Sequence, residues 1–192
     1  MTKKRVAVLI SGRGSNMTAL IEAAEAPDYP AQIVLVLSNA PHAAGLARAQ
    51  LAGIATAVVD HKLFGDDREA FERALDDTLH AHRIDLVCLA GFMRLLTPWF
   101  VTRWSGRMLN IHPALLPQFK GLHTHRRALE AGVTRHGATV HFVAVEMDAG
   151  PIVLQDSVPV IEGDTEATLA QRVLELEHRL YPQALRLVAE AR

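Results

Sequence analysis

The chain has 192 residues, a formal net charge of −1 and one cysteine. A chain of this length can bury roughly 70% of its unfolded surface, so we expect residues 1–192 to form a single domain that folds without disulfides or a metal ion. The small net charge and the lack of a long basic run argue against nucleic-acid binding. The first apolar run, residues 6–10, is too short for a signal sequence or a membrane span, so we expect a cytoplasmic protein without membrane attachment.

A glycine-containing loop follows the first predicted strand. Residues 6–10 lead into Ser11-Gly12-Arg13-Gly14-Ser15 and then into a predicted helix over residues 16–24. A strand, a glycine turn and a helix N-terminus together present free N–H groups and a positive dipole end to an anion. A dinucleotide-binding loop would need a third glycine where Met17 stands, and a Walker loop would need Gly-Lys-Ser/Thr. The loop therefore indicates either a site for a single phosphate group or a plain tight turn.

Apolar strands and amphipathic helices then alternate. Continuous apolar runs, which are typical of parallel sheets covered on both faces, predict strands over residues 32–37, 55–59 and 84–90. Cys88 lies in the last run, which favours a buried hydrophobic role over a reactive one. The predicted helices cover residues 43–52 and a segment capped by Asp66 or Asp67, whose apolar face carries Phe71, Leu75 and Leu79. Arg68 lies in the first turn of that helix, where a cation opposes the helix dipole, and this hints at another use.

Apolar residues surround Arg94 in the segment Gly91-Phe92-Met93-Arg94-Leu95-Leu96, before Thr97-Pro98 begins the next predicted helix. These side chains could form the wall of a pocket for a flat aromatic ligand. They could also be ordinary core, which is the commoner outcome for such residues.

The segment Met108-Leu109-Asn110-Ile111-His112 predicts a strand that must end at Pro113, because proline has no N–H for further pairing. Side chains alternate along a strand, so Asn110 and His112 share one face while Ile111 points into the core. In open α/β sheets ligands bind beyond the carboxyl ends of the strands. The pattern therefore indicates a ligand site, with a hydrogen-bonded turn and a surface histidine as the alternative.

The last third of the chain favours antiparallel pairing. The segment His123-Thr124-His125 could suggest a metal site, but we discount it because no further ligands follow at zinc-like spacing. Thr124 is instead expected to cap a helix over residues 126–131. Residues 138–143 and 151–155 are too close in sequence for a crossover helix, so an antiparallel pair is expected. A final helix should begin near Asp164 and be bent or interrupted at Pro182. The fold class is therefore α/β, with about five parallel strands, antiparallel C-terminal strands and helices on both faces.

Six segments together resemble the phosphoribosylglycinamide formyltransferases within the folate-dependent formyltransferase family. They cover residues 10–16, 89–96, 109–117, 121–125, 140–143 and 147–151. The resemblance implies a single Rossmann-like formyltransferase domain. It also implies transfer of a formyl group from 10-formyltetrahydrofolate, a co-substrate used without a metal, to the amine of glycinamide ribonucleotide. The products would be formylglycinamide ribonucleotide and tetrahydrofolate, in the purine pathway to IMP, and transfer would be direct through a tetrahedral intermediate.

The resemblance also implies roles for individual residues. The catalytic residues would be Asn110, His112 and Asp148. The N-terminal half would carry the phosphate and ribonucleotide site, formed by Gly14, Ser15, Asn16, Met17 and Thr18, together with Glu177 from the last helix. The folate site would be formed by Arg68, Met93, Arg94, Leu95, Leu96, Asn110, Val143 and Asp148, and the resemblance assigns the folate and catalytic sites mainly to the C-terminal half of the domain.

Two other functions stay open at this point. One is a formyltetrahydrofolate hydrolase, in which water replaces the amine, although the glycine loop argues for a phosphorylated acceptor. The other is a non-catalytic protein that binds folate or a nucleotide. In each case we expect small-molecule ligands, no nucleic-acid partner, and a monomer or weak homodimer.

Overall fold

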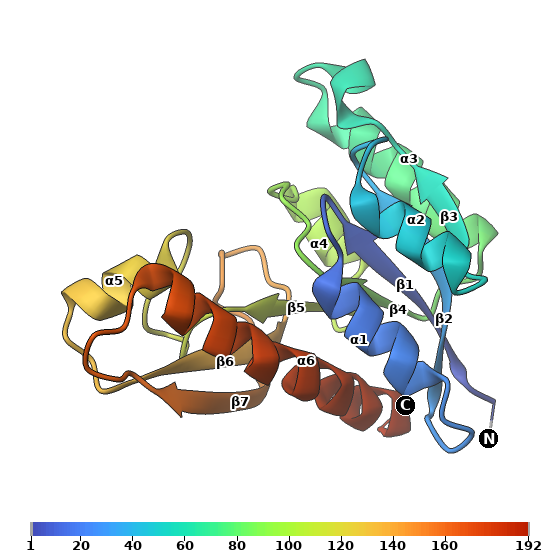
Figure 1. The fold of residues 1–192 in the computed structure, drawn as a ribbon. Helices are drawn as coiled ribbons and strands as arrows, with labels where there is room; N and C mark the ends of the chain where they lie inside the picture. The colour runs from blue at the N-terminus through green and yellow to red at the C-terminus, as the bar shows by residue number, and fades with distance from the viewer. Residues whose placement is uncertain (1, 192) are drawn as a thin grey trace.

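One mixed sheet organises the structure, a computed structural model that describes residues 2–191. Within these residues seven strands pair in the order β3-β2-β1-β4-β5-β6-β7 (Figure 1). The strands are β1 (Lys4–Ile10), β2 (Ala31–Ser38), β3 (Ala55–Val58), β4 (Leu86–Leu89), β5 (Met108–His112), β6 (Arg135–Phe142) and β7 (Ile152–Pro159). The first five pair in parallel and the last two in antiparallel register, which confirms the predicted sheet.

Helices cover both faces of this sheet, as predicted. They are α1 (Ser15–Ala24), α2 (Ala44–Leu51), the 3-10 helix η1 (His61–Phe64), α3 (Arg68–Ala81), α4 (Pro98–Arg103), α5 (Thr124–Glu130) and α6 (Glu166–Glu190). Alternate residues of β1 show the two cores: Val8 packs in the core that includes α1 and α6, whereas Leu9 packs in the one that includes α3 and α4. In Figure 1 α1 and α6 lie side by side, although they come from opposite ends of the chain.

The local signals in the α3 region predicted the structure well. Asp67 caps α3 by accepting a hydrogen bond of 2.9 Å from Ala70 N. The predicted apolar face of α3, formed by Phe71, Leu75 and Leu79, is buried. Cys88 is also buried, and desolvation raises the pKa of its thiol to about 12, so it acts as a small hydrophobic side chain.

Two predictions about helices differ from the structure: the predicted cap of α5 was wrong, and of the bend or interruption expected at Pro182 the interruption does not occur. Thr124 is the first residue of α5 and not its cap; the capping position is held by His123, whose φ of 57° places it in the left-handed region. The helix α6 is not interrupted at Pro182 but runs through it to Glu190. Burial along α6 outweighs the one missing N–H, and the Tyr29 hydroxyl donates a hydrogen bond of 2.7 Å to the Pro182 carbonyl.

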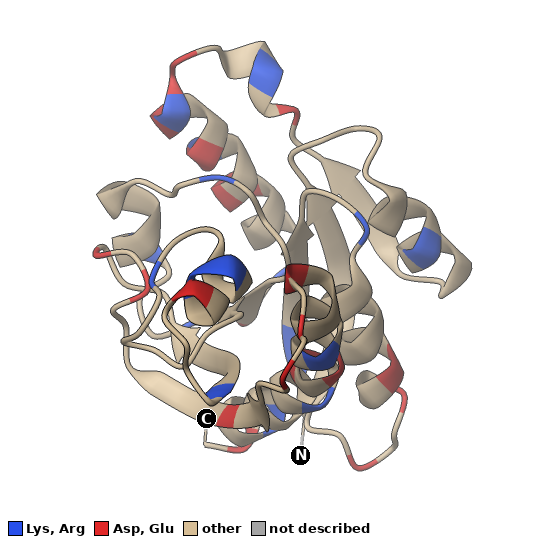
Figure 2. Cartoon of the chain, turned by 60° about the vertical axis from the view of Figure 1, so that its left-hand side comes forward, with Lys and Arg blue, Asp and Glu red and all other residues tan. Residues whose placement is uncertain are grey.

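Lysine and arginine are interspersed with aspartate and glutamate along the chain in Figure 2, without a side of one charge sign in that view. Among the helices of residues 2–191, none combines the length and apolarity that crossing a membrane requires.

Candidate active site

The loops that leave the carboxyl ends of β1 and β4 line a common cavity of about 290 Å³. Its walls are residues 11–16 after β1 and Ala90, Gly91 and Met93 after β4. Two hydrogen bonds join these loops: Ser11 N donates to the Gly91 carbonyl at 3.2 Å, and the Ser11 hydroxyl accepts from Met93 N at 2.8 Å. The glycine loop and the apolar segment around Arg94, predicted as parts of two different sites, therefore face each other across one cavity.

His112 ends the neighbouring strand β5 and is held from two sides. Its Nε2 lies 2.9 Å from the Phe119 carbonyl oxygen, to which it can donate a hydrogen bond. Its Nδ1 lies 3.5 Å from Oδ2 of Asp148. The ring is almost completely buried. Each ring nitrogen of His112 therefore faces an oxygen acceptor, and an imidazole held in this way can take part in proton transfer.

Asp148 reaches this position from the loop between β6 and β7, where it adopts a φ of 52°. Its Oδ2 accepts a hydrogen bond of 2.9 Å from Gly121 N, and its Oδ1 lies 3.7 Å from Nε2 of His141. The carboxylate is therefore enclosed by groups from β5, from the loop after it and from β6. The structure brings Asp148 and His112 together, as the resemblance implied.

Asn110 pairs directly with His141 across β5 and β6. His141 Nδ1 lies 2.9 Å from the Phe142 carbonyl and Nε2 lies 3.4 Å from Asn110 Nδ2. Burial lowers the pKa of His141 more than the Phe142 carbonyl and Asp148 raise it. A neutral ring with its proton on Nδ1 can accept from the Asn110 amide, which keeps a second N–H free for a ligand.

At the glycine loop, Gly14 precedes α1 with a φ of 71°. Asn16 is buried, and its amide donates a hydrogen bond of 2.8 Å to Oε2 of Glu177 on α6, which is also buried. Desolvation raises the pKa of Glu177 to about 7, against the lowering effect of the Asn16 hydrogen bond. Met17 points into the core and is fully buried, so only its backbone is available to a ligand.

The apolar segment after β4 is divided between core and surface: Phe92 and Leu96 are partly buried and pack against the core that includes α3 and α4, whereas two other side chains are exposed. Met93 is 71% exposed and Leu95 is 63% exposed, which leaves their side chains available to a ligand. The guanidinium of Arg68, at the start of α3, donates to the Leu95 carbonyl and so reaches this loop. On the β6–β7 loop Val145 is also exposed, whereas Val143 is partly buried and its N–H donates to the Met108 carbonyl.

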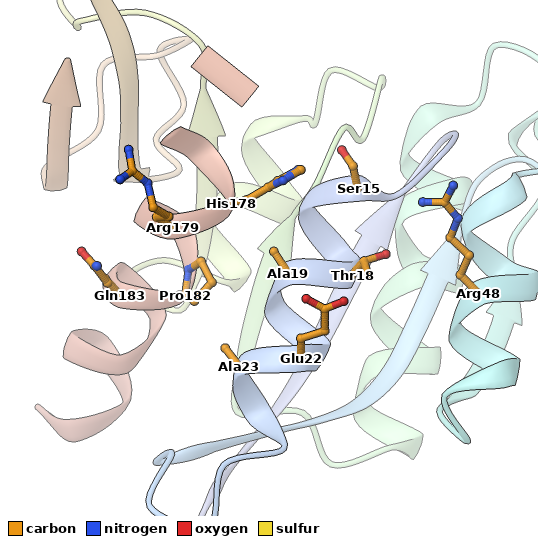
Figure 3. A pocket seen from close by; sticks show the side chains of 10 residues that line it. All are labelled: Ser15, Thr18, Ala19, Glu22, Ala23, Arg48, His178, Arg179, Pro182 and Gln183. Carbon is orange, nitrogen blue, oxygen red and sulfur yellow. The ribbon is translucent and has the colours of Figure 1, made fainter. Parts of the chain in front are cut away.

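A second cavity, of about 510 Å³, lies beside the same helix N-terminus. Figure 3 shows it between α1 and α6, with Arg48 of α2 on the far side of α1. Ser15 lines both cavities. His178, on the α6 side, is partly buried, and desolvation lowers the pKa of its imidazole. The cavity between α1 and α6 therefore adjoins the glycine loop and is lined by both polar and apolar side chains.

This site lies in a domain that matches a known family. The sequence profile described as "Formyl transferase" matches residues 4–185. The chain belongs to the formyl transferase family. That assignment agrees with the fold predicted from the resemblance.

Named relatives of this formyl transferase domain include long and short proteins. A Homo sapiens relative, named trifunctional purine biosynthetic protein adenosine-3, is 56% identical over 97% of this chain, which spans only 18% of that protein. The phosphoribosylglycinamide formyltransferase of Escherichia coli (strain K12) is 48% identical over 97% of this chain and 88% of its own length. The crystal structure of phosphoribosylglycinamide formyltransferase from Brucella melitensis matches with a TM-score of 0.94 and 54% identity, covering 98% of this chain and 96% of that chain.

Sequence reasoning did not identify His141, whose ring lies beside Asn110 and Asp148. Its position in β6, directly opposite Asn110, is the signal that could have identified it. The pair His123 and His125 lies at the start of α5, and within residues 2–191 no group of three or more histidine, cysteine, aspartate or glutamate side chains is arranged to hold a metal ion.

Proposed function

We propose that this chain transfers the formyl group of 10-formyltetrahydrofolate to the amine of glycinamide ribonucleotide, in the purine pathway to IMP. The observation that carries the proposal is the meeting of Asp148, His112 and Asn110 at the sheet edge that also bears the glycine loop. The names of the short bacterial relatives support the same activity. Because this chain spans only 18% of the trifunctional relative, the proposal does not extend to the other activities of that protein.

In the proposed reaction the acceptor amine attacks the formyl carbon and a tetrahedral oxyanion forms. The free N–H of Asn110 donates to this oxyanion, and removing such a donor costs roughly 3 kcal/mol of transition-state stabilisation in other enzymes. His112, flanked by Phe119 O and Asp148, stabilises the same charge and assists the proton transfer. The proton leaves the attacking nitrogen, the bond from the formyl carbon to N10 breaks, and N10 of the departing folate receives a proton.

The remaining residues bind the two substrates in this proposal. The glycine loop, with Gly14, Ser15, Asn16 and the backbone of Met17 and Thr18, binds the acceptor's phosphate, because free N–H groups at a helix N-terminus suit an anion. Glu177 contacts the ribose or amine end of the same molecule. The exposed apolar residues Met93 and Leu95, with Arg94, Leu96 and Val143, bind the folate rings, and Arg68 binds the glutamate tail.

The formyl transfer itself is the test. We expect the purified chain to form tetrahydrofolate and formylglycinamide ribonucleotide in equal amounts when both substrates are present, as measured by absorbance and mass spectrometry. The His112→Asn variant serves as the control for background transfer. Formate release that does not depend on the acceptor would instead indicate the hydrolase, and tight binding of either ligand without turnover would indicate a binding protein.

We propose further that residues 1–192 act as one cytoplasmic domain, as a monomer or weak homodimer.

A further inference from the structure

The loop that follows His112 supplies one of the two acceptors that hold its ring. This loop, residues 113–121, leaves β5 at Pro113 and brings the Phe119 carbonyl to within 2.9 Å of His112 Nε2. Phe119 itself has a φ of 54°. A carbonyl in an irregular loop can orient an imidazole only if the loop backbone is fixed by other contacts. The groups that fix this loop therefore bear on the orientation of His112.

Thr139 makes three of those contacts. It lies on β6 directly opposite His112 in the antiparallel register and is completely buried. Its hydroxyl donates to the Ala114 carbonyl at 2.6 Å and accepts from Leu116 N at 3.1 Å. It also accepts from Gln155 Nε2 at 2.8 Å. A hydroxyl has one donor and two acceptor positions, and all of them are used here.

Gln155 extends this row to the next strand. It lies on β7 opposite Thr139, so His112, Thr139 and Gln155 occupy paired positions on three adjacent strands. Side chains of directly paired residues project from the same face of a sheet. Besides Thr139, the Gln155 amide donates to the Leu116 carbonyl at 2.9 Å. The loop backbone between Ala114 and Leu116 is thus held at both carbonyls and one N–H by two side chains.

We propose that Thr139 and Gln155 are positioning residues that hold the loop after β5 so that the Phe119 carbonyl keeps the His112 ring in its reactive orientation. The hydrogen bonds of the two side chains run to the loop backbone and to each other, so both act on the His112 ring through the loop. The expected effect on rate rests on the proposed formyl transfer, whereas the effect on the His112 ring does not. Loss of the hydrogen bonds from Thr139 and Gln155 to the loop should lower kcat more than it changes KM, because it disturbs the reacting geometry and not the substrate contacts.

Matched variants separate this role from a merely structural one. Thr139→Val removes the hydroxyl and keeps the shape, and it should lower kcat on the order of 10²-fold, as small displacements of reacting groups do. Thr139→Ser restores the hydroxyl and should return kcat to within about threefold of the wild type. The control is Thr56→Val, since Thr56 also accepts from a glutamine amide, that of Gln50, at 3.1 Å on the edge strand β3. This control should leave kcat and both KM values unchanged.

A second measurement does not depend on turnover. In protein with ¹⁵N-labelled histidine, the His112 ring signals can be identified by their loss in His112→Asn. We expect Thr139→Val to shift these signals and Thr139→Ser to leave them in place. Gln155→Leu alters a more exposed residue, and it should shift the same signals and lower kcat even if Thr139→Val does not fold.

The outcomes decide between the explanations. Wild-type kcat and unshifted His112 signals in folded Gln155→Leu or Thr139→Val would overturn the proposal. A fall in kcat that Thr139→Ser does not rescue would also overturn it. If the wild type shows no formyl transfer, the proposed function fails, and the histidine signals alone then decide whether the two residues hold His112.

Discussion

Asn16 and Glu177 lie 161 positions apart in the sequence, yet the Asn16 amide donates a hydrogen bond of 2.8 Å to the Glu177 carboxylate. The bond joins the start of α1 to α6 beside the glycine loop. Burial raises the pKa of Glu177 from 4.5 to about 7, so this carboxyl changes its charge near neutral pH. The proposed acceptor site therefore contains a carboxyl group that titrates near neutral pH.

The first prediction concerns stability and Glu177→Gln. Between pH 4.5 and 7 the folded state binds the extra proton, so stability falls as pH rises through this window. At 1.36 kcal/mol for each pKa unit, the ionised group costs the folded state about 3 kcal/mol above pH 7. Urea unfolding should show Glu177→Gln more stable than the wild type at pH 8 and a smaller difference at pH 5. Glu175→Gln, at an exposed position of α6, is the control, and equal pH dependence in wild type and Glu177→Gln would contradict the prediction.

The second prediction tests the catalytic residues. His112→Asn and Asp148→Asn should each lower kcat on the order of 10²- to 10⁴-fold, because proton transfer and stabilisation of the protonated imidazole are lost. Both KM values should change far less than kcat, since the glycine loop and the segment around Met93, which make most of the proposed substrate contacts, are left in place. Steady-state kinetics with both substrates measures this. Asp156→Asn, at an exposed position of β7, should behave as the wild type. A variant of His112 or Asp148 with near-normal kcat would remove that residue from the mechanism.

Elements whose signals are local were predictable from the sequence. Val8 and Leu9 belong to a continuous apolar run because successive side chains pack in opposite cores, and this is what identified a central parallel strand. The alternation along β5 likewise predicted that Asn110 and His112 share a face. By contrast, nothing near Asp148 in the sequence indicates that its carboxylate meets His112; only the resemblance implied that contact, because the β6–β7 loop sets it.

The errors arose where tertiary contacts outweigh local preference. Composition favoured burial of Met93, but the Ser11 hydroxyl holds Met93 N and turns the loop so that the side chain is exposed. The cap of α5 is His123 because the preceding loop imposes a left-handed φ, which no helix-start signal shows. Pro182 is tolerated within α6 since burial along the helix offsets one lost hydrogen bond.

The third prediction concerns the conformation of the glycine loop. Gly14 has a φ of 71°, and a Cβ there would lie 3.3 Å from the Gly45 backbone and 3.1 Å from the end of the Met17 side chain. Gly14→Ala should therefore shift the N–H groups at the start of α1 and raise KM for glycinamide ribonucleotide about tenfold or more. Gly53→Ala is a matched control, because Gly53 has a φ of 72° with open space around it. An equal KM in the two variants would show that the loop does not bind the acceptor.

The fourth prediction concerns the folate tail. Arg68→Ala removes the guanidinium that reaches the Leu95 carbonyl, and it should raise KM for 10-formyltetrahydrofolate about tenfold, as expected for a hydrogen bond to a charged group. Because the contact between Arg68 and the glutamate tail would be equally strong in the ground state and the transition state, kcat should not change. Arg73→Ala, on the same helix, breaks an exposed ion pair with Glu69 and a cation–π contact with Trp99, and it should leave both constants unchanged. A lower kcat with an unchanged KM in Arg68→Ala would assign this arginine to the chemistry instead.

The fifth prediction concerns acid stability and His136. This histidine is completely buried on β6, with its ring 5.2 Å from that of His125, and desolvation, followed by His125, lowers its pKa from 6.5 to about 4. As pH falls through this window the unfolded chain takes up the proton first, so the stability present above pH 6.5 is progressively lost. The loss amounts to about 3 kcal/mol at pH 4. His136→Leu should remove this part of the acid sensitivity, whereas His42→Leu, at an exposed position, should not. Unfolding by urea at pH 7 and pH 4.5 measures both, and an unchanged difference in His136→Leu would show that other groups cause the acid sensitivity.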